Sequence, residues 1–465
     1  APKKTFSYTL FFLADLCKNR ESFMKAKLTR SALFRSLEKV ANRLSEHRNC
    51  NAPNYQYPVA SAALTAFGVF YFQQPSLLCH EGTLAQKIYY DNFLKLFHRQ
   101  PVISSQTLRN ILDPVDQQSF IPVFDDVFNK LDRSGLLGIL AFNPYMGLLL
   151  SGDGVDYFSS EEISCTNCNH AHHIREDGTQ RVVYSHKMFN VGIVHPTENM
   201  FIPLNPEFMT PQDGSKKQDC EQNGAKRWMT SFRNRHKTVR ATLLVDALHC
   251  NHEFLSLVLE SRFQFIATCK PGSCKTLYEW VNTARQGKDT TIVEHRKIIK
   301  GKSILFRYEY LNNVPLRDTE DALRVNFISL CEIDPKTEKV LHQFEYVTSL
   351  NVKDSNIEQL ILAGRKRWKV ENEGNNALKN QGYYFDHNYG HGKKHLSAVI
   401  ATLIVFSFLV HTILRLVGQD GITQVQKECY ARKKCIEILR SSIEFCRVNT
   451  WEELYTAALK ALEKT

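Results

Sequence analysis

Two apolar segments of this chain each lead into an aspartate. Residues 148–153 read LLLSGD and end at Asp153, and residues 241–246 read ATLLVD and end at Asp246. The carboxyl end of a buried strand is where a sheet presents polar side chains to a cleft. Because Asp is also common in turns, either aspartate alone is explained as well by a turn. Two of them, after strands that we expect to be neighbours, favour a shared site.

A third acid, Glu371, is expected on a later helix, four residues after Arg367 and on the same face. In isolation this is an ordinary surface pair. If the helix packs on the sheet, Glu371 can join Asp153 and Asp246. Three carboxylates repel one another unless cations neutralise them, and oxygen ligands suit Mg²⁺ or Mn²⁺. Two such ions would support phosphodiester chemistry. All three acids are thus candidate metal ligands, and Arg367 is a candidate to orient Glu371 or to contact a phosphate. Glu373 is a rival on another helix face.

A second group of residues has the spacing of a zinc site. Cys165 and Cys168 form a C-x₂-C pair, and histidines follow in the next twenty residues. Two thiolates and two imidazoles make a tetrahedral Zn²⁺ site. The expected ligands are Cys165, Cys168, His173 and His186, with three further residues in reserve: His170, His172 and Cys220. Such a site would brace the loop after Asp153 and do no chemistry. The alternative is a hairpin tip with coincidental cysteines and histidines.

The composition is that of a folded, basic protein. The chain has 465 residues, a net charge of +11, 43% hydrophobic and 23% charged residues. Wholesale disorder is therefore excluded, and a polyanionic partner is expected. The 13 cysteines, most of them single within apolar runs, are typical of a reduced intracellular protein. Residues 396–410 carry no charge but are shorter than the roughly 20 residues a bilayer requires, so we expect a buried helix and no membrane partner.

The elements that must position the acids follow a recognisable order. Strands are expected at residues 146–150, 181–184 and 191–203, then a helix at 222–237, a strand at 241–245, a helix at 251–261 and a strand at 263–269. Three strands, helix, strand, helix, strand is the ribonuclease H-like order. It predicts an α/β fold with a mixed sheet and helices on both faces. Residues 290–350 are rich in strand formers and indicate an inserted β-strand subdomain.

We divide the chain into five regions on this basis. Residues 1–135 form a helical region for DNA binding or dimerisation, with many Lys and Arg between residues 18 and 48. Residues 136–285 and 353–395 form the catalytic core, interrupted by the insertion at 286–352. Residues 396–465 form a helical C-terminal region. A basic stretch in the core suggests a track for backbone phosphates, although a solvated helix face explains it as well. The residues expected on this track are Lys226, Arg227, Arg233, Arg235 and Lys237.

The segment RKRWKVE at residues 365–371 resembles the R-W-x-[IV]-E segment of bacterial insertion-sequence DDE transposases, in the group with a Y-R-E-K signature. Other stretches fit the same family: KQDCE at 217–221, AKRW at 225–228, LVDAL at 244–248, CKP at 269–271, LYEW at 277–280 and HNYGHG at 387–392. The chain departs from the signature at two positions. The Tyr falls at Gly364, and the Lys falls on Leu378, with Lys379 beside it as the candidate DNA contact.

The resemblance implies a ribonuclease H-like catalytic domain in which Asp153, Asp246 and Glu371 bind two Mg²⁺ or Mn²⁺ ions. It implies a DNA transposase that binds transposon ends, hydrolyses phosphodiester bonds and joins the 3′-OH ends to target DNA. It also implies a homodimer that bridges two ends in the bacterial cytoplasm. The alternative is a domesticated, catalytically inactive DNA- or zinc-binding protein of the same fold.

Overall fold

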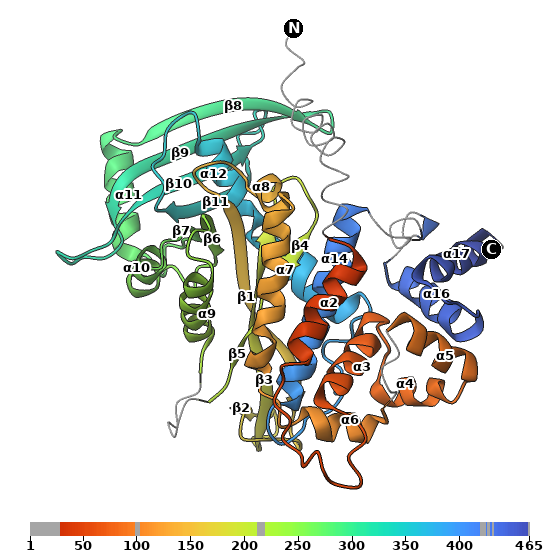
Figure 1. Cartoon of the computed structure of the whole chain (residues 1–465). Coiled ribbons are helices and arrows are strands. Elements are labelled where there is room, and N and C mark those ends of the chain that lie inside the picture. Colours follow the sequence, from red (N-terminus) through yellow and green to blue (C-terminus); the bar gives the residue numbers. More distant parts are fainter. Residues whose placement is uncertain are drawn as a thin grey trace.

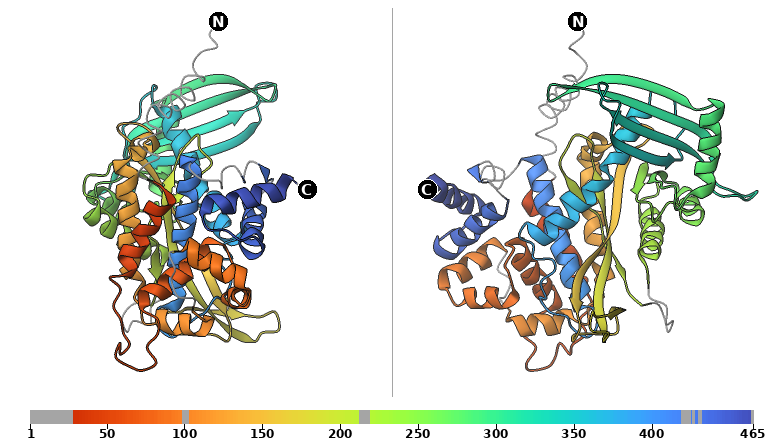
Figure 2. Two further views of the ribbon diagram at one scale, coloured as in Figure 1. Left: turned by 45° about the vertical axis from the view of Figure 1, so that its right-hand side comes forward. Right: turned by 180° about the vertical axis from the view of Figure 1, so that it is seen from behind.

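The protein is a mixed α/β structure in which helices cover both faces of one large sheet (Figures 1 and 2). The computed structural model describes residues 28–97, 103–211, 219–418, 425, 428–429 and 432–463. The basic residues 18–27 of the N-terminal region and residues 217–218 of the KQDCE segment lie outside this description. The coarse prediction of an α/β fold with flanking helices is confirmed.

The sheet has parallel strands at its centre and antiparallel strands on both sides. Its order is β2-β3-β1-β6-β7-β11-β10-β9-β8, and β4 and β5 also pair with β3. β1 runs parallel to β6, which runs parallel to β7, whereas β3 is antiparallel to β1. The strands of this first part are β1 (Leu148–Ser160), β2 (Asn169–Ile174), β3 (Gln180–Val194), β4 (Phe201–Pro203), β5 (Glu207–Met209), β6 (Ala241–Val245) and β7 (Gln264–Thr268).

The first strand is longer than its apolar run predicts. β1 passes through Asp153 and continues to Ser160, so the expected end of the strand at Asp153 is wrong. β6 accompanies β1 only as far as Ser151, while β3 continues beside it and pairs Asn190 with Asp153. β3 is likewise one strand where the sequence suggested the end of one and the start of another. Pairing with this long partner holds the polar half of β1 in extended form. Asp153 therefore lies where β1 loses its parallel neighbour.

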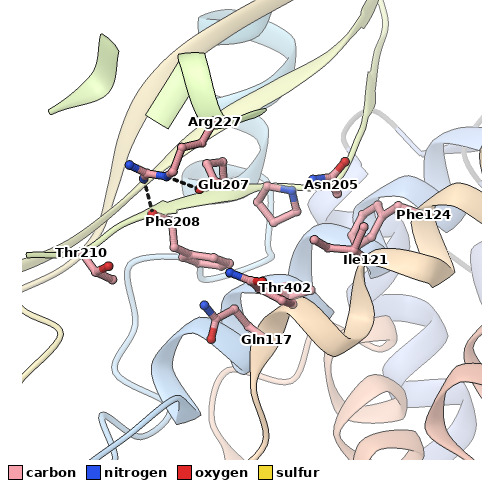
Figure 3. A pocket seen from close by; sticks show the side chains of 11 residues that line it. Gln117, Ile121, Phe124, Asn205, Glu207, Phe208, Thr210, Arg227 and Thr402 are labelled. Atoms are coloured by element: carbon pink, nitrogen blue, oxygen red, sulfur yellow. Dashed lines mark hydrogen bonds and ion pairs between the residues drawn. The ribbon is translucent and has the colours of Figure 1, made fainter. Parts of the chain in front are cut away.

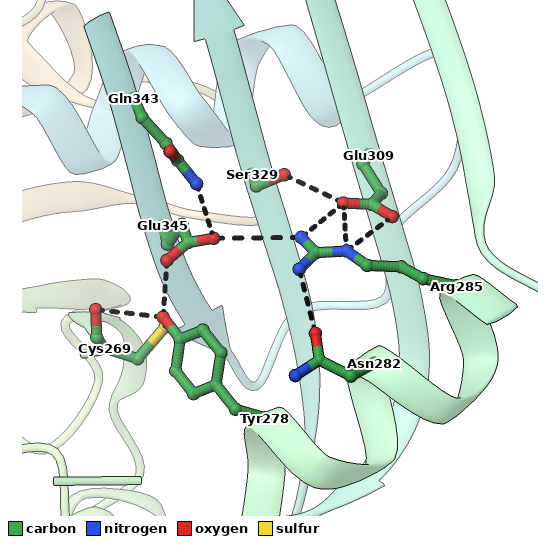
Figure 4. A network of polar contacts seen from close by, with 8 residues as sticks. All are labelled: Cys269, Tyr278, Asn282, Arg285, Glu309, Ser329, Gln343 and Glu345. Carbon is green, nitrogen blue, oxygen red and sulfur yellow. Dashed lines mark hydrogen bonds and ion pairs between the residues drawn. The ribbon is translucent and has the colours of Figure 1, made fainter. Parts of the chain in front are cut away.

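The inserted strands extend the same sheet. β11 pairs antiparallel with β7, so the insertion is joined to the core by backbone hydrogen bonds. The helix α11 (Lys275–Gly287) packs beneath it, and Figure 4 shows its Arg285 between two half-buried carboxylates of the inserted strands, Glu309 and Glu345. Tyr278 on the same helix donates a hydrogen bond to Glu345 at 2.6 Å. The inserted strands are β8 (Thr291–Ile299), β9 (Lys302–Pro315), β10 (Arg324–Ile333) and β11 (Val340–Thr348).

The N-terminal and C-terminal helices pack together on one side of the sheet (Figure 1). Asn92 joins them, because its amide donates to the carbonyl of Ile443 at 2.8 Å and its side-chain oxygen accepts from the Val448 N–H at 3.0 Å. The helices of this body are α2 (Arg30–Ala41), α3 (Val59–Tyr71), α4 (Leu77–Leu84), α5 (Lys87–Leu96), α6 (Ser105–Leu112), η1 (Gln117–Phe120), α7 (Ile121–Arg133), α8 (Leu136–Leu140), α14 (Leu396–Val417), α16 (Arg432–Phe445) and α17 (Trp451–Glu463).

The apolar helix α14 is the core of this body. Among the described residues it is the one helix long and apolar enough to cross a membrane, and 89% of its most apolar window is buried inside the protein. It packs against α3 and β4. The expectation of a buried helix at residues 396–410 is thus confirmed.

On the opposite side of β1 lie α9 (Glu221–Arg235) and α10 (His252–Glu260), which connect β5, β6 and β7 (Figure 2). The predicted cap Asn251 accepts a hydrogen bond from the N–H of Phe254. The segment that carries Glu371 is not the single regular helix that its pattern suggests. It consists of α12 (Ile357–Gly364), a 3₁₀ turn η2 (Arg365–Trp368), a π-helical turn η3 (Val370–Asn375) and α13 (Asn376–Asn380). Single π turns of this kind are frequent at functional sites.

Candidate active site and metal centre

The two predicted aspartates lie at the same level of neighbouring parallel strands. The register pairs Ser151 of β1 with Leu244 of β6, and each aspartate comes two residues later. The carboxylate of Asp246 accepts hydrogen bonds from the N–H of Leu248 at 3.0 Å and contacts Nδ1 of the buried His249 at 2.8 Å. Its side chain is 35% exposed. The sheet therefore directs both acids toward one edge, as their positions in the sequence predict.

Polar side chains of the sheet hold the Glu371 segment over Asp153. The Ser151 hydroxyl donates to the carbonyl of Arg367 at 2.9 Å. On the neighbouring strand, the Asn190 amide donates to the side chain of Asn375 at 2.7 Å. Glu371 lies between these two anchors and pairs with the largely buried Arg367 guanidinium at 2.9 Å. These contacts place the Glu371 segment against β1 and β3, and the charge of Glu371 acts on Asp153.

The acids influence one another's charge. Burial, together with the charges of Glu221, Glu371 and Asp246, raises the pKa of Asp153 to about 7, while the nearby Arg367 opposes the rise. Burial would also raise the pKa of Asp246, but the hydrogen bond and charge of His249 lower it overall. The rival Glu373 instead lies near Lys369, whose pKa burial lowers and the charge of Glu373 partly restores. This arrangement favours Glu371 over Glu373 as the third carboxylate.

Glu221, the last residue of the KQDCE stretch, is a fourth acid near Asp153 whose role the sequence alone does not predict. It begins α9, and the Gly154 N–H donates to its carboxylate. A Cβ at Gly154 would lie 2.4 Å from Oε2 of Glu221, so only glycine permits this approach. His249 stands between the acids, with Nε2 3.7 Å from Glu221 and Nδ1 against Asp246. One feature of the sequence could have indicated Glu221: it is an acid directly before the start of the helix predicted at residues 222–237.

Three of the five predicted phosphate-track residues make ion pairs or hydrogen bonds with other parts of the protein. Arg227 pairs with Glu207 and Asp219, each at 2.7 Å. Arg233 donates to several backbone carbonyls that include Ser261 and Val239, and Arg235 pairs with Asp125 of α7. Their positive charge is largely balanced or shielded inside the protein. The remaining predicted cations are the half-buried Lys226 and Lys379 and the exposed Lys237.

The predicted zinc ligands are only partly brought together. Cys165, Cys168 and His186 converge, but the fourth member of the cluster is His391, which replaces the predicted His173. Cys168 lies just before the first residue of β2, Asn169, which pairs with Ser185. His173 lies near the other end of β2, where it pairs with Arg181. The offset of about five residues moves His173 roughly 17 Å along the strand, too far for a shared ion.

The reserve residues are not in the cluster either. His170 and His172 are exposed on β2, and Cys220 is exposed before α9. His391 lies in the HNYGHG segment, whose place in the family resemblance gave no hint of a ligand. The side chains that do converge have ligand atoms within 4.8 Å of one another, and the cluster can bind a metal ion such as zinc.

Within the described residues, no three carboxylates lie as close to one another as the ligand atoms of the Cys165, Cys168, His186 and His391 cluster do. Two ions about 4 Å apart, each about 2.1 Å from its oxygen ligands, do not require such closeness, because their ligands can lie on opposite sides of the pair. A cavity of about 370 Å³, lined in part by Gly154, Glu221 and Lys187, opens beside the acids. Another, of about 230 Å³, lies between η1, β5 and α14 (Figure 3). Its lining residues in the described part of the chain include Arg227 and its partner Glu207, but not Asp153, Asp246 or Glu371.

Comparison with known proteins does not assign the chain. No model of a known protein family matches it, and no curated protein matches it significantly.

Proposed function

We propose that this chain is a DNA transposase that cleaves phosphodiester bonds at transposon ends and joins the 3′-OH ends to target DNA. The observation that supports the proposal is that the charges of Asp246 and Glu371, which come from two other elements of the chain, both act on the half-buried Asp153. The resemblance of residues 365–371 to DDE transposases supplies the reaction class. The alternative is an inactive relative of the same fold. It is disfavoured because all three acids are present and, besides burial, the charges of Glu371 and Asp246 raise the pKa of Asp153.

The residues at this edge fit divalent cations. The donor set consists of carboxylate oxygens, which Mg²⁺ and Mn²⁺ prefer. Burial and then the neighbouring negative charges raise the pKa of Asp153, and bound cations would offset those charges. When bound, two such ions would activate the attacking oxygen and stabilise the leaving oxygen. The protein's own part is orientation: Arg367 holds Glu371, and His249 holds Asp246.

The strand order supports a ribonuclease H-like core. Reading across the sheet, the short strands β4 and β5 pair with β3, β3 with β1, β1 with β6 and β6 with β7. β3 is antiparallel to β4, β5 and β1, whereas β1, β6 and β7 are parallel, with α9 and α10 as the connecting helices. The inserted strands lie between the second aspartate and the glutamate, as in the transposase group that the sequence resembles.

The DNA partner and the homodimer belong to the same proposal. Lys226, Lys237 and Lys379 are the cations we assign to backbone phosphates, together with the basic N-terminal region. Because phosphate contacts release counterions, end binding should weaken steeply with salt. A dimer would place two such sites on two ends.

The test is cleavage of a plasmid that carries the gene with its natural flanking DNA, with and without Mg²⁺ or Mn²⁺. Asp153→Asn, Asp246→Asn and Glu371→Gln should abolish cleavage and leave DNA binding in a mobility-shift assay within about twofold. Glu373→Gln and Asp156→Asn are matched controls that remove a nearby carboxylate and should cleave normally. Wild-type cleavage by Glu371→Gln, or metal-independent cleavage, would contradict the proposal.

A further inference from the structure

Four side chains from three segments of the chain converge on one point. Cys165 and Cys168 come from the turn before β2, His186 from β3 and His391 from the loop before α14. The two sulfurs are 3.8 Å apart, and the two Nε2 atoms are 3.0 Å apart. Sulfur–nitrogen distances are 3.6 Å from Cys165 to His186, 3.4 Å from Cys168 to His186 and 3.2 Å from Cys168 to His391.

These distances are those of a tetrahedron of zinc ligands. With Zn–S near 2.3 Å and Zn–N near 2.05 Å, a tetrahedral site has edges of about 3.8 Å for S–S, about 3.6 Å for S–N and about 3.3 Å for N–N. The distances in the structure follow the same ranking and differ from these values by about 0.4 Å at most. Ordinary hydrogen bonding would not bring two imidazole nitrogens and two thiols to a common centre.

The surroundings orient the ligands toward that centre. Nδ1 of His391 lies 3.1 Å from the carbonyl of Gly392, which places the proton on Nδ1 and leaves the Nε2 lone pair for a metal. The ring of Tyr157 stacks on His186, and Phe158 packs against His391. Cys168 and His186 are each only 4% exposed. An apolar wall of this kind excludes water and strengthens binding to thiolates.

The loop that carries His391 is fixed from elsewhere. The Asp113 carboxylate accepts hydrogen bonds from the N–H groups of Lys393 and Lys394, each at about 3.0 Å. The Asn167 amide, between the two cysteines, donates to the Lys394 carbonyl at 2.5 Å. Gly392, with φ of +70°, allows the turn that presents His391. The ligand is thus preorganised for a site whose other members lie more than two hundred residues earlier in the chain.

We propose that Cys165, Cys168, His186 and His391 bind one Zn²⁺ as a closed structural site that clamps the paired strands β1 and β3 to the segment following Glu371. β1 carries Asp153, and the loop of His391 connects the Glu371 segment to α14. The ion therefore ties together the two parts of the chain that must hold the acids in place. This inference goes beyond the proposed reaction and stands whether or not the chain cleaves DNA.

The test is the zinc content of the full-length protein, purified from zinc-supplemented cells, exhaustively dialysed and analysed by elemental mass spectrometry. The wild type should hold about one zinc per chain, and Cys168→Ser or His391→Ala should hold less than about a tenth of this. His173→Ala and Cys220→Ser are matched controls that remove an exposed histidine and an exposed cysteine, and they should retain the full amount. A wild type without zinc, loss in His173→Ala or retention in His391→Ala would overturn the proposal.

A second measurement guards against variants that lose zinc by misfolding. His391→Cys supplies another zinc ligand at the same place and should retain the metal. After cobalt substitution it should show stronger thiolate-to-metal charge-transfer absorption than the wild type, because three sulfurs replace two. Unchanged absorption in folded, cobalt-loaded His391→Cys would show that residue 391 is not a ligand. Neither measurement depends on DNA cleavage, so failure of this site and failure of the transposase proposal remain distinguishable.

Discussion

Asp153→Asn should stabilise the folded protein at alkaline pH while abolishing the proposed DNA cleavage. Burial and the charges of Glu221, Glu371 and Asp246 raise the pKa of Asp153 from its ordinary 3.8 to about 7. The native state therefore binds this proton more tightly than the unfolded chain does. The stabilisation that accompanies protonation is complete below about pH 4 and is lost as the pH rises through 7. Above that pH the wild type bears an ionised carboxylate among other carboxylates, which asparagine avoids.

The magnitude follows from the two pKa values. Their difference, at about 1.36 kcal/mol per pH unit, gives an upper limit of roughly 4 kcal/mol. Because Asp153 is only half-buried and solvent screens its neighbours, we expect about 1–2 kcal/mol of this. The free energy of unfolding of Asp153→Asn should therefore exceed that of the wild type by about 1–2 kcal/mol above pH 8, and the gap should close toward pH 4.

The assay is urea unfolding at several pH values without added Mg²⁺ or Mn²⁺. Asp156→Asn is the matched control, since it removes a carboxylate of the same strand that is 53% exposed and pairs with Lys187. Its stability should stay within about 0.5 kcal/mol of the wild type. If Asp153→Asn is less stable than the wild type at alkaline pH, or if the gap does not change with pH, Asp153 does not lie among repelling acids.

Three further outcomes are expected. Mn²⁺ at 100 times its dissociation constant should stabilise the wild type by about 2.7 kcal/mol in thermal unfolding; an equal gain in Glu371→Gln would remove that residue from the metal site. Arg367→Ala should slow DNA cleavage by about 10–100-fold and leave DNA binding intact, because it frees a ligand that the guanidinium orients; an unchanged cleavage rate would argue against this role. Arg285→Ala should lower the free energy of unfolding by about 2–3 kcal/mol, since it leaves Glu309 and Glu345 half-buried without their cation; a loss below 1 kcal/mol in urea unfolding would contradict the importance of the network in Figure 4.

Short-range signals in the sequence predicted the local elements well. The apolar run at β6 matches a strand whose five residues are all buried, and the cap Asn251 marks the start of α10. The C-x₂-C pair and His186 were predictable because their spacing along one hairpin is itself the signal. These features are decided by neighbours in the chain, so sequence periodicity and spacing contain them.

Features set by partners distant in the sequence were missed or misjudged. β1 continues past Asp153 because β3 pairs with it. The residues of β1 alone do not predict this extension. The helix around Glu371 tightens into a 3₁₀ turn and then widens into a π turn where side chains of the sheet hold it at Ser151 and Asn190. His391 is a cluster member only because the loop before α14 folds back onto the hairpin.

Polar residues on one face of β3 contact the distant segment that carries Glu371 and His391. His186 and Asn190 are four residues apart and so lie on the same face of the strand. Asn190 holds the Glu371 segment through Asn375, and His186 meets His391 further along the same chain segment. Ser151 of the neighbouring strand makes the third contact, to the carbonyl of Arg367. Polar residues that recur in phase on an otherwise buried strand are costly unless partners satisfy them. Such residues therefore mark the face where a distant segment must dock, and here that segment carries Glu371 and His391, the proposed third acid and the proposed fourth zinc ligand.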